Sequence, residues 1–446
     1  MPHVRRLLLL ILAATSAAAP QAAAFRPFAA LAELAPLVAQ YRALPAGSLP
    51  VADAVLLLTR AAETFSAARA YANVSALRTD IVALHSSTPP SPAQAQALLL
   101  ARIALSEALT AERRFAQALE VLGAAGAAVE ATPSSSSSRL LAAALLRSRA
   151  QVLDCSGDSA LAVSTFEQGL PALPWPSEPL TTPASVRLAK TYLLLLRRAG
   201  RGGTPAAARV EAALLARGPW RRADQLPRAF HPELSSQPFY NASRPPWGLG
   251  ALVAALSASA PALLAEYRAL EAQALLLTEA ECINDPTSGV WRYFTVNAPW
   301  VEHVDQEGCS THTPTACALL ARARAEGWGG SALRGTFSSV AGGGVLKPHC
   351  GLTNAQVKLH LGLQVPVQAA VEGGGGGAAR SEPCAVLTVA GETHAWVEGE
   401  VLMFDDSFEH SVVNSCQGAE RVVFQLVLPH GEARGEAWDG KFISGD

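Results

Sequence analysis

The stretch from 356 to 364 constrains the fold most strongly, because its side chains alternate between apolar and polar. One face of an extended chain would carry four apolar residues, Val357, Leu359, Leu361 and Leu363. The other face would carry Lys358 and His360. Two basic groups on a strand that is otherwise apolar are costly to bury unless they meet polar partners. The alternation therefore predicts a β-strand with a core on one face and a polar site on the other.

Two histidines that lie far apart along the chain are the candidate metal ligands. His349 follows a proline in a loop just before the alternating strand, and His410 ends the segment that begins at Phe404. Each histidine stands beside a turn at the edge of an expected strand, where the ligands of a jelly roll point inward. Imidazole with oxygen donors and open coordination positions suits Fe(II). We therefore expect His349 and His410 to bind a metal ion.

Basic side chains are expected to bind carboxylates beside this metal. They are Lys358, His360 and Arg421, the last of which opens another apolar strand. A facial triad would have a carboxylate two positions after the first histidine, but the sequence has Gly351 there. Spacing alone therefore leaves open both a metal site and a pair of structural histidines.

The net charge of −2 over 446 residues does not indicate a nucleic-acid or acidic-surface partner. The length is sufficient for two or three domains with a sizeable core. Alanine and leucine dominate the first half of the chain, whereas glycine, valine, histidine and cysteine gather in the second half. This shift in composition predicts a helical part followed by a β part.

Residues 1–25 are typical of a secretory signal, with Arg5 and Arg6 before an apolar run and small residues after it. We expect a protein of the endoplasmic reticulum or Golgi lumen, or a secreted protein. Membrane attachment is expected only if the apolar run stays uncleaved as an anchor. An organelle transit peptide is the less favoured interpretation, because arginine and serine are few in this stretch.

The seven cysteines fit such an oxidising compartment. Cys309 and Cys317 close a short loop and are candidates for a disulfide. The sequence does not pair the others, Cys155, Cys282, Cys350, Cys384 and Cys416. No Cys-x-x-Cys pair occurs, which argues against a structural zinc site. Asn73 and Asn241 are glycosylation acceptors if the chain enters the secretory pathway.

Residues 26–217 are expected to be helical, because alanine and leucine recur at helical spacing between proline-rich and serine-rich breaks. The clearest helices are expected at 51–70, 93–109, 111–124, 139–153 and 186–198. Helix pairs joined by polar turns indicate an α-solenoid or a bundle with tetratricopeptide (TPR) character. Residues 218–281 are interpreted as an aromatic-rich connector and helices that pack on a larger domain.

Residues 282–431 change to a β pattern interrupted by one helix at 316–326. Strands are expected at 292–296, 333–340, 356–364, 385–389, 393–397, 400–404 and 421–428. Short strands with turn signals between them predict an antiparallel barrel or jelly roll. Residues 373–377 are expected to form a hairpin loop, and 432–446 a C-terminal tail.

Residues 282–430 resemble the aspartyl/asparaginyl β-hydroxylase domain, whose members are 2-oxoglutarate-dependent oxygenases that hydroxylate Asp or Asn in epidermal-growth-factor-like domains. The resemblance is carried by PHCGLTN at 348–354, LHLGL at 359–363, WVEG at 396–399, FDDSFEH at 404–410 and RVVF at 421–424. It implies an α+β chain in which a TPR-like helical region precedes a double-stranded β-helix, a jelly roll of the cupin type.

The resemblance also implies the cofactors and their ligands. His349 and His410 would bind Fe(II), with Gly351 where other oxygenases have a carboxylate, and 2-oxoglutarate and O2 would be the cosubstrates. Arg421 and Ser338 would bind the distal carboxylate of 2-oxoglutarate. His360 would support the carboxylate that chelates the iron, and Lys358 would lie where the substrate carboxylate and the cosubstrate are contacted. Cys309 and Cys317 fall where the family has a short-loop disulfide.

The chain departs from the family at Gln356 and Lys358, where the family typically has arginine. These positions are the ones expected to touch the substrate, so three functions stay open. The first is β-hydroxylation of Asp or Asn in a secretory-pathway protein or peptide. The second is oxidation of a free amino acid or small molecule, and the third is a non-catalytic binding protein. Asp405, Asp406 and Glu409 are expected to orient loops or neighbouring groups rather than to bind metal.

Overall fold

The computed structural model describes residues 27–45, 48–67, 70–88, 91–130, 136–172, 183–279, 282–297, 309–330, 332–368 and 382–433. The chain divides into two compact units, one ending at Glu178 and the other beginning at Pro179. The expected signal at 1–25, the glycine loop at 373–377 and the tail from 434 onward lie outside the described residues.

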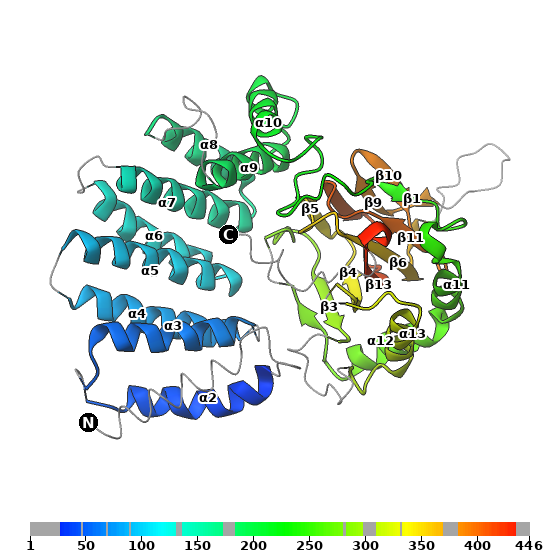
Figure 1. Ribbon diagram of the computed structural model, residues 1–446, viewed down its shortest axis with the longest axis horizontal. Helices are drawn as coiled ribbons and strands as arrows, with labels where there is room; N and C mark the ends of the chain where they lie inside the picture. The colour runs from blue at the N-terminus through cyan, green and yellow to red at the C-terminus, as the bar shows by residue number, and fades with distance from the viewer. Residues whose placement is uncertain are drawn as a thin grey trace. The chain divides into compact units, whose positions relative to one another are not determined.

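The first unit is a series of helices, each of which packs against the next one along the chain (Figure 1). The helices are α2 (Pro27–Arg42), α3 (Val51–Ala67), α4 (Tyr71–Ser86), α5 (Pro92–Ala111), α6 (Phe115–Glu130), α7 (Ser136–Cys155) and α8 (Ser159–Gly169), followed by η1 (Leu170–Ala172). Packing of each helix on its sequence neighbours is the arrangement of helical-repeat proteins. Of the two expected arrangements, a solenoid of helical repeats is therefore confirmed and a bundle is not.

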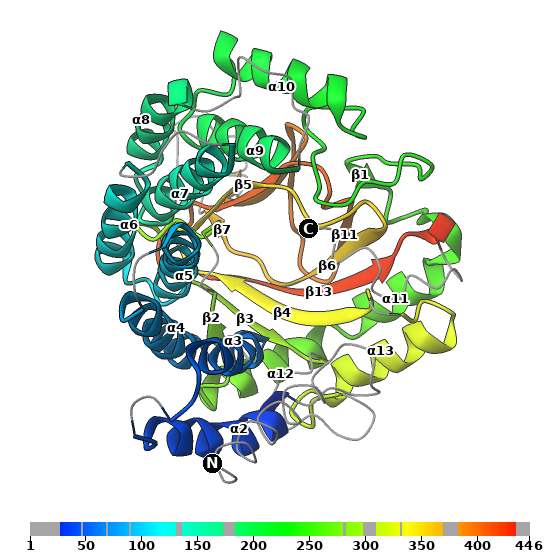
Figure 2. The ribbon, with the colours of Figure 1, turned by 60° about the vertical axis from the view of Figure 1, so that its left-hand side comes forward.

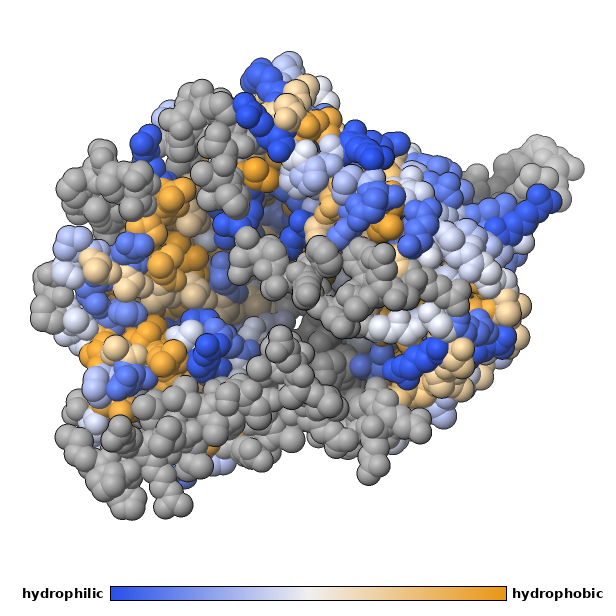
Figure 3. Space-filling model, viewed as in Figure 1, coloured by the Kyte–Doolittle hydropathy of each residue, from blue (hydrophilic) through white to orange (hydrophobic). Residues whose placement is uncertain are grey.

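The core of this helical unit consists of small and branched aliphatic side chains. One cluster is centred on Leu57, Leu58 and Leu77, and a second on Leu109 and Leu122. Larger apolar side chains also reach the surface, among them Val51, Leu56, Leu100, Leu140 and Leu161. Figure 3 shows apolar areas between polar ones on the face of this unit that is in view.

Two further helices, α9 (Pro183–Arg198) and α10 (Pro205–Arg217), belong to the second unit. They pack on each other, and α9 also contacts the strand β5 (Val345–His349). The expected helical domain of 26–217 therefore crosses the boundary between the two compact units. Local sequence patterns do not indicate this boundary, because the contact between α9 and β5 joins segments about 150 residues apart.

Most of the second unit is built from two antiparallel sheets (Figure 2). The seven-stranded sheet has the order β1-β11-β6-β13-β4-β3-β2. Its strands are β1 (Phe239–Tyr240), β2 (Leu277–Thr278), β3 (Trp291–Thr295), β4 (Arg334–Val340), β6 (Gln356–Gln364), β11 (Val401–Phe404) and β13 (Arg421–Pro429). The central strands β6 and β13 pair with each other along nearly their whole length, and each also pairs with another strand on its other side. Both edges of each strand are therefore hydrogen-bonded within the sheet.

The four-stranded sheet has the order β10-β9-β12-β5. Its strands are β5, β9 (Ala385–Val389), β10 (Glu392–Ala395) and β12 (His410–Asn414). A hydrophobic cluster joins the two sheets, with Phe404 and Val423 from one sheet and Leu387 and Val412 from the other. A separate pair, β7 (Val367–Gln368) and β8 (Glu382–Pro383), completes the strands.

The alternation in β6 separates two environments, as the sequence predicted. Val357, Leu359 and Leu361 are fully buried, and the helix α12 (Ala260–Ala272) packs against this strand. Lys358 and His360 lie on the opposite face, where they are in register with Phe404 and Leu402 of β11. The apolar face of the sheet therefore meets helices, while the polar face lies on the side of the core shared with the four-stranded sheet.

The helices of the second unit include α11 (Gly250–Ala258), α12 (Ala260–Ala272) and α13 (Pro314–Ala325), with short turns η2 (Pro246–Gly248) and η3 (Gly431–Ala433). Within the described residues, no single helix is long and apolar enough to cross a membrane. Only α11 and α12 taken together, bent by 57°, meet that test by length and composition.

Two strands that the sequence analysis treated as loop carry the candidate metal ligands, because β5 ends at His349 and β12 begins at His410. The proline at 348 made a strand unattractive, since proline cannot donate to a sheet. However, β5 is an edge strand of its sheet, and proline is tolerated there. The expectation that His349 lies in a loop was therefore wrong, and the strand that begins at His410 was not expected.

Two disulfides lie within the second unit. Cys309 bonds to Cys317, as expected, and Cys384 bonds to Cys416, which the sequence left unassigned. The second disulfide ties the start of β9 to the end of β12, so it closes one end of the four-stranded sheet. Disulfides of this kind are typical of proteins that fold in an oxidising compartment.

Candidate metal and carboxylate site

The two candidate metal ligands lie side by side in the four-stranded sheet. His349 and His410 are register partners across the antiparallel pair β5 and β12. Their ring centroids are 4.1 Å apart, with 50° between the ring planes. Strand pairing therefore brings together two residues that are 61 positions apart in sequence, and it fixes the backbone at both of them.

Each imidazole is oriented by a bond to the backbone two residues earlier. Nδ1 of His349 lies 2.8 Å from the carbonyl oxygen of Lys347, and Nδ1 of His410 lies 2.9 Å from that of Phe408. A carbonyl only accepts, so Nδ1 must carry the hydrogen in both rings, and Nε2 keeps its lone pair. Metal-binding histidines commonly donate their other nitrogen in this way.

Both imidazoles are also held in the neutral form that binds metals. Burial, followed by the neighbouring His410, lowers the pKa of His349 well below its usual value. Burial and the nearby Lys358 lower the pKa of His410 to about 3. A proton therefore does not compete for either Nε2 at neutral pH.

The structure leaves no room for a carboxylate side chain at position 351. A Cβ atom built on Gly351 would overlap the carboxylate of Asp406, and the amide of Gly351 donates to the carbonyl oxygen of Asp406 at 2.6 Å. Within the described ranges, no group of three or more His, Cys, Asp or Glu side chains is arranged to hold a metal. The two neutral imidazoles are the candidate donors, and such a pair would suit a divalent metal that keeps other positions open.

Asp406 contacts the side chains of Gln356 and Lys358, the two positions at which the sequence departs from the family. Nζ of Lys358 lies 2.9 Å from Oδ2 of Asp406, and Nε2 of Gln356 donates to Oδ1 at 3.5 Å. Asp406 is almost fully buried, with 2% of its surface exposed. The charge of Lys358 is therefore already balanced by the chain itself, as expected for an acidic residue that orients its neighbours.

A buried guanidinium lies on the inner face of the seven-stranded sheet. Arg421 is 1% exposed, and its Nε and Nη1 are buried without an acceptor among the described residues. Burial lowers its pKa to about 10, so the group is still a cation at neutral pH. An unbalanced buried cation is costly, and two free donors beside it fit an anion with two oxygens.

Ser338 stands on the neighbouring strand at the position expected for a second carboxylate donor. Arg421 is in register with Val340 and Val423 with Ser338, so Arg421 and Ser338 share one face of the sheet. The indole of Trp291 donates to the hydroxyl oxygen of Ser338 at 3.0 Å. Because that oxygen accepts from Trp291, its own hydrogen is left for another acceptor.

His360 and Arg421 are linked through Trp396. The guanidinium carbon of Arg421 lies 4.5 Å from the centroid of the Trp396 ring, and the His360 ring stacks on the same indole at 6.2 Å. Neither ring nitrogen of His360 nor Nε1 of Trp396 has a hydrogen-bond partner in the described part of the chain. Burial, Lys358 and Arg421 hold the pKa of His360 well below its usual value.

The structure therefore brings the six expected site residues together between the two sheets. They are Ser338, His349, Lys358, His360, His410 and Arg421. The role of Trp396, which contacts Arg421 and His360, was not predicted from the sequence, because an aromatic residue in a β pattern usually belongs to the hydrophobic core. It also missed Arg197, whose partner Glu409 is 212 residues away. No local pattern signals either contact.

The matched family agrees with this geometry. Residues 257–430 match the family model described as aspartyl/asparaginyl beta-hydroxylase. The mouse protein named aspartyl/asparaginyl beta-hydroxylase is 32% identical over 162 residues, which cover 36% of this chain and 19% of that protein. The mouse aspartate beta-hydroxylase domain-containing protein 1 is 38% identical over 101 residues, covering 22% of this chain and 24% of that protein.

The alignments thus span about a fifth to a quarter of these curated relatives. Among solved structures, a Pseudomonas putida prolyl-4-hydroxylase superposes on 44% of this chain and 91% of its own, with a TM-score of 0.25 and 17% identity. A superposition of that quality carries no weight for fold or function. The matched segment contains every expected site residue. Residues 257–430 of this chain are therefore similar to the aspartyl/asparaginyl β-hydroxylase family, as the resemblance predicted.

Proposed function

We propose that this protein is an Fe(II)- and 2-oxoglutarate-dependent dioxygenase that hydroxylates the β-carbon of Asp or Asn residues in a secretory-pathway protein or peptide. One observation carries the proposal. Two neutral imidazoles with free Nε2 lone pairs share the core between the sheets with a buried guanidinium whose Nε and Nη1 have no acceptor among the described residues. A cation in such a position is explained by an anionic cosubstrate that binds beside the metal.

Fe(II), bound by His349 and His410, would supply the oxidising chemistry with O2 and 2-oxoglutarate. The chain's own contribution is binding and charge balance. Arg421 would hold the distal carboxylate of 2-oxoglutarate with its free N–H groups, and Ser338 would add its hydroxyl hydrogen. Both side chains are fully buried or nearly so, so the carboxylate would be held without competition from water.

His360 would stand beside the other carboxylate of the cosubstrate. Its ring is neutral and carries one donor N–H, and Trp396 holds it in a fixed plane. Lys358 contributes positive charge at the same face, although Asp406 shares it. These contacts would orient the cosubstrate and exclude water, while the substrate approaches from the exposed side of Lys358.

The two disulfides support an oxidising compartment, in line with the expected secretory route to the endoplasmic reticulum or Golgi lumen or to the outside. An epidermal-growth-factor-like domain is a fitting substrate of that compartment. Its Asp or Asn side chain would have to be recognised without a bidentate arginine at 356 or 358, since the chain has Gln356 and Lys358.

The deciding experiment follows conversion of 2-oxoglutarate to succinate and searches substrates for one added oxygen by mass spectrometry. We expect Fe(II)-dependent succinate formation, stimulated by an epidermal-growth-factor-like peptide that gains 16 Da on Asp or Asn. The His349→Ala variant is the matched negative control. Absence of metal binding and of 2-oxoglutarate turnover in the folded protein would leave the non-catalytic binding protein as the function.

A second candidate is a related oxygenase that acts on a free amino acid or another small molecule. The pairing of Lys358 with Asp406 favours it, because this contact reduces the positive charge available to a carboxylate of a peptide side chain. The same assay separates the two functions when free amino acids replace the peptide, with and without chloride. Succinate formation that responds to free amino acids and ignores peptides would select the second function.

A further inference from the structure

The helix α9 reaches the backbone beside both imidazoles. Its last two residues, Arg197 and Arg198, have separate partners in the sheet. Arg197 donates from Nη1 to Oε2 of Glu409 at 2.6 Å, and Glu409 directly precedes His410. Arg198 donates from Nε to the carbonyl oxygen of Pro348 at 3.0 Å, and Pro348 directly precedes His349. Each arginine therefore holds the residue next to one imidazole.

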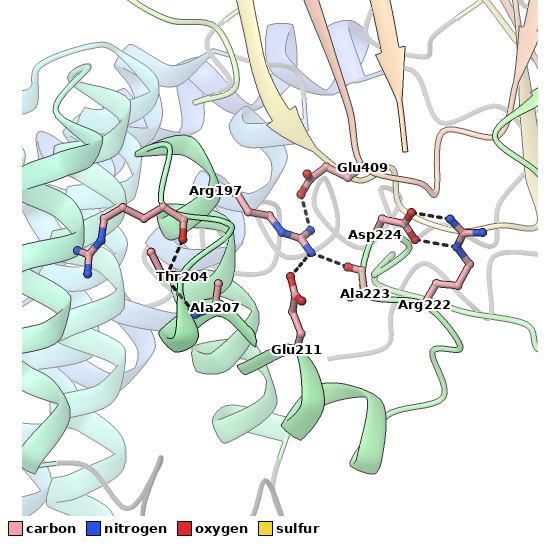
Figure 4. A network of polar contacts seen from close by, with 9 residues as sticks. Arg197, Thr204, Ala207, Glu211, Arg222, Ala223, Asp224 and Glu409 are labelled. Atoms are coloured by element: carbon pink, nitrogen blue, oxygen red, sulfur yellow. Dashed lines mark hydrogen bonds and ion pairs between the residues drawn. The ribbon is translucent and has the colours of Figure 1, made fainter. Parts of the chain in front are cut away.

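The Arg197 side chain is fixed rather than loosely exposed (Figure 4). Its Nη2 also donates to Oε1 of Glu211 in α10 at 2.8 Å and to the carbonyl oxygen of Ala223 at 3.0 Å. Only 13% of the side chain is exposed. Burial by itself would lower the pKa of Arg197, but the carboxylates of Glu409 and Glu211 raise it above its usual value. The guanidinium thus stays charged and fully engaged.

The segment after α10 holds the same loop from a second direction. The amide of Glu409 donates to the carbonyl oxygen of Asp224 at 2.7 Å. The carboxylate of Asp224 accepts two hydrogen bonds from the guanidinium of Arg222, at 2.8 and 2.6 Å. Nε2 of Gln225 donates to the hydroxyl of Ser407 at 2.8 Å. The side chain and the amide of residue 409 are therefore both tied down just before β12 begins.

We propose that Arg197 and Arg198 are positioning residues for the two metal-binding imidazoles, Arg197 through Glu409 and Arg198 through Pro348. The inference rests on the proposed function, because it takes His349 and His410 as the metal ligands. It goes beyond that function because α9 lies outside residues 257–430, the part of the chain that matches the family. Metal affinity then depends on a helix that precedes the matched domain.

The physical reason is that two ligands alone give a metal site little tolerance for error. A site with more protein ligands keeps most of its donors when one shifts, whereas a pair loses half of them. Groups that orient metal ligands typically change metal affinity by about 10- to 100-fold when removed. The clamp by α9 fixes the entry of His410 into β12 and the end of β5 at His349.

The test uses Co(II) as an oxygen-stable probe on the full chain. Affinity is measured by titration calorimetry and the ligand environment by the visible absorption of Co(II). Arg197→Ala and Arg198→Ala are each expected to weaken Co(II) binding by about 10-fold or more and to alter the spectrum. Glu409→Gln should resemble Arg197→Ala, and Arg197→Lys should recover part of the affinity because it keeps the charge.

Two matched controls separate positioning from general damage. Glu211→Ala removes the α10 arm of the Arg197 network but keeps the arm to Glu409, and Arg187→Ala alters an exposed arginine of the same helix. Arg187→Ala is expected to bind Co(II) as the unaltered protein does, and Glu211→Ala is expected to lose clearly less affinity than Arg197→Ala, because the bond to Glu409 remains. Circular dichroism and the denaturant midpoint report folding, and Arg197→Lys supplies the test if Arg197→Ala does not fold.

The outcomes distinguish this inference from the proposed function. If the unaltered protein binds no more Co(II) than His349→Ala, the proposed function fails and the inference fails with it. If the unaltered protein binds Co(II) but the arginine variants keep its affinity and spectrum, the inference is wrong while the function stands. Equal losses in Glu211→Ala and Arg197→Ala would also overturn it, because they would indicate a structural effect of the whole network.

Discussion

His349 and His410 face each other as cross-strand neighbours of an antiparallel pair, so their ring positions are set by backbone hydrogen bonding. The pair lies within the second compact unit, which also holds the buried guanidinium of Arg421 against the indole of Trp396.

Replacement of either imidazole is expected to abolish metal binding with little loss of fold. His349→Ala and His410→Ala each leave one nitrogen donor, which is too few to retain a divalent ion at micromolar concentration. Calorimetric titration with Co(II) measures the loss. His394→Ala is the control, because His394 is exposed and pairs with Glu392. Retained binding in both site variants would place the metal elsewhere.

Replacement of Arg421 is expected to change cosubstrate affinity and stability in opposite directions. Arg421→Met should weaken 2-oxoglutarate binding by about 100-fold, which corresponds to ~3 kcal/mol for a charged hydrogen-bonded pair. It should also raise the melting temperature of the protein without cosubstrate, because a buried unbalanced cation is removed. Differential scanning calorimetry with and without 2-oxoglutarate checks both signs. An unchanged 2-oxoglutarate affinity would remove Arg421 from the site.

The contact between Lys358 and Asp406 is expected to stabilise the fold only as a pair. Lys358→Met leaves the buried Asp406 carboxylate without its cation and should lower the free energy of unfolding by roughly 2 kcal/mol, between the values for exposed and fully buried pairs. The double variant Lys358→Met/Asp406→Asn should lose less than the two single variants combined. Urea denaturation of the four proteins gives the coupling energy. Strict additivity would show that the contact has no energetic weight.

The carboxyl of Asp405 is expected to make stability fall as pH rises from about 4 to about 7. Burial raises its pKa to about 7, from about 4 in an unfolded chain. The folded form therefore holds a proton that the unfolded form has lost between these values. This one group should reduce the free energy of unfolding by up to ~1.4 kcal/mol per pH unit in that window.

The Asp405→Asn variant isolates this contribution, because an amide cannot ionise and its oxygen can still accept from the amide of Ser407. The stability of the variant relative to the unaltered protein should increase from pH 4 to pH 7. Denaturant midpoints at several pH values measure the difference. A constant difference across this range would mean that Asp405 titrates as an exposed carboxyl.

The disulfide between Cys384 and Cys416 is expected to stabilise the four-stranded sheet. It closes a loop of 32 residues, and removal of a native disulfide typically lowers the free energy of unfolding by about 2 to 5 kcal/mol. The double variant Cys384→Ser/Cys416→Ser should therefore unfold at lower denaturant concentration. Its response to a reductant, compared with that of the unaltered protein, is the check. Identical midpoints would show that β9 and β12 need no such link.

The regular strands and the helix packing were predictable from sequence. Alternation located β6 to the residue, and turn signals gave β9 and β13 closely. The strand β5 was missed because proline at 348 argues against a strand, and only the sheet topology shows that β5 lies at an edge. Local periodicity contains no information on such an edge.

The site was predictable only in part, for a related reason. Single residues such as His349 and Arg421 stand out because their chemistry conflicts with an apolar neighbourhood. The residues that position them do not stand out, since Arg197 resembles any basic residue at the end of a helix. The bond between Arg197 and Glu409 joins residues 212 positions apart, and only the folded chain brings them together.

The close approach of Gly351 to Asp406 also limits how this centre can be redesigned. Installing a third protein ligand at 351 would require two simultaneous substitutions, because Asp406 occupies the volume that the new side chain needs. With a metal on His349 and His410, small exogenous anions such as azide or halides are therefore expected to meet no carboxylate from position 351. A halogenation activity would be easier to engineer here than in an enzyme whose third ligand must first be deleted.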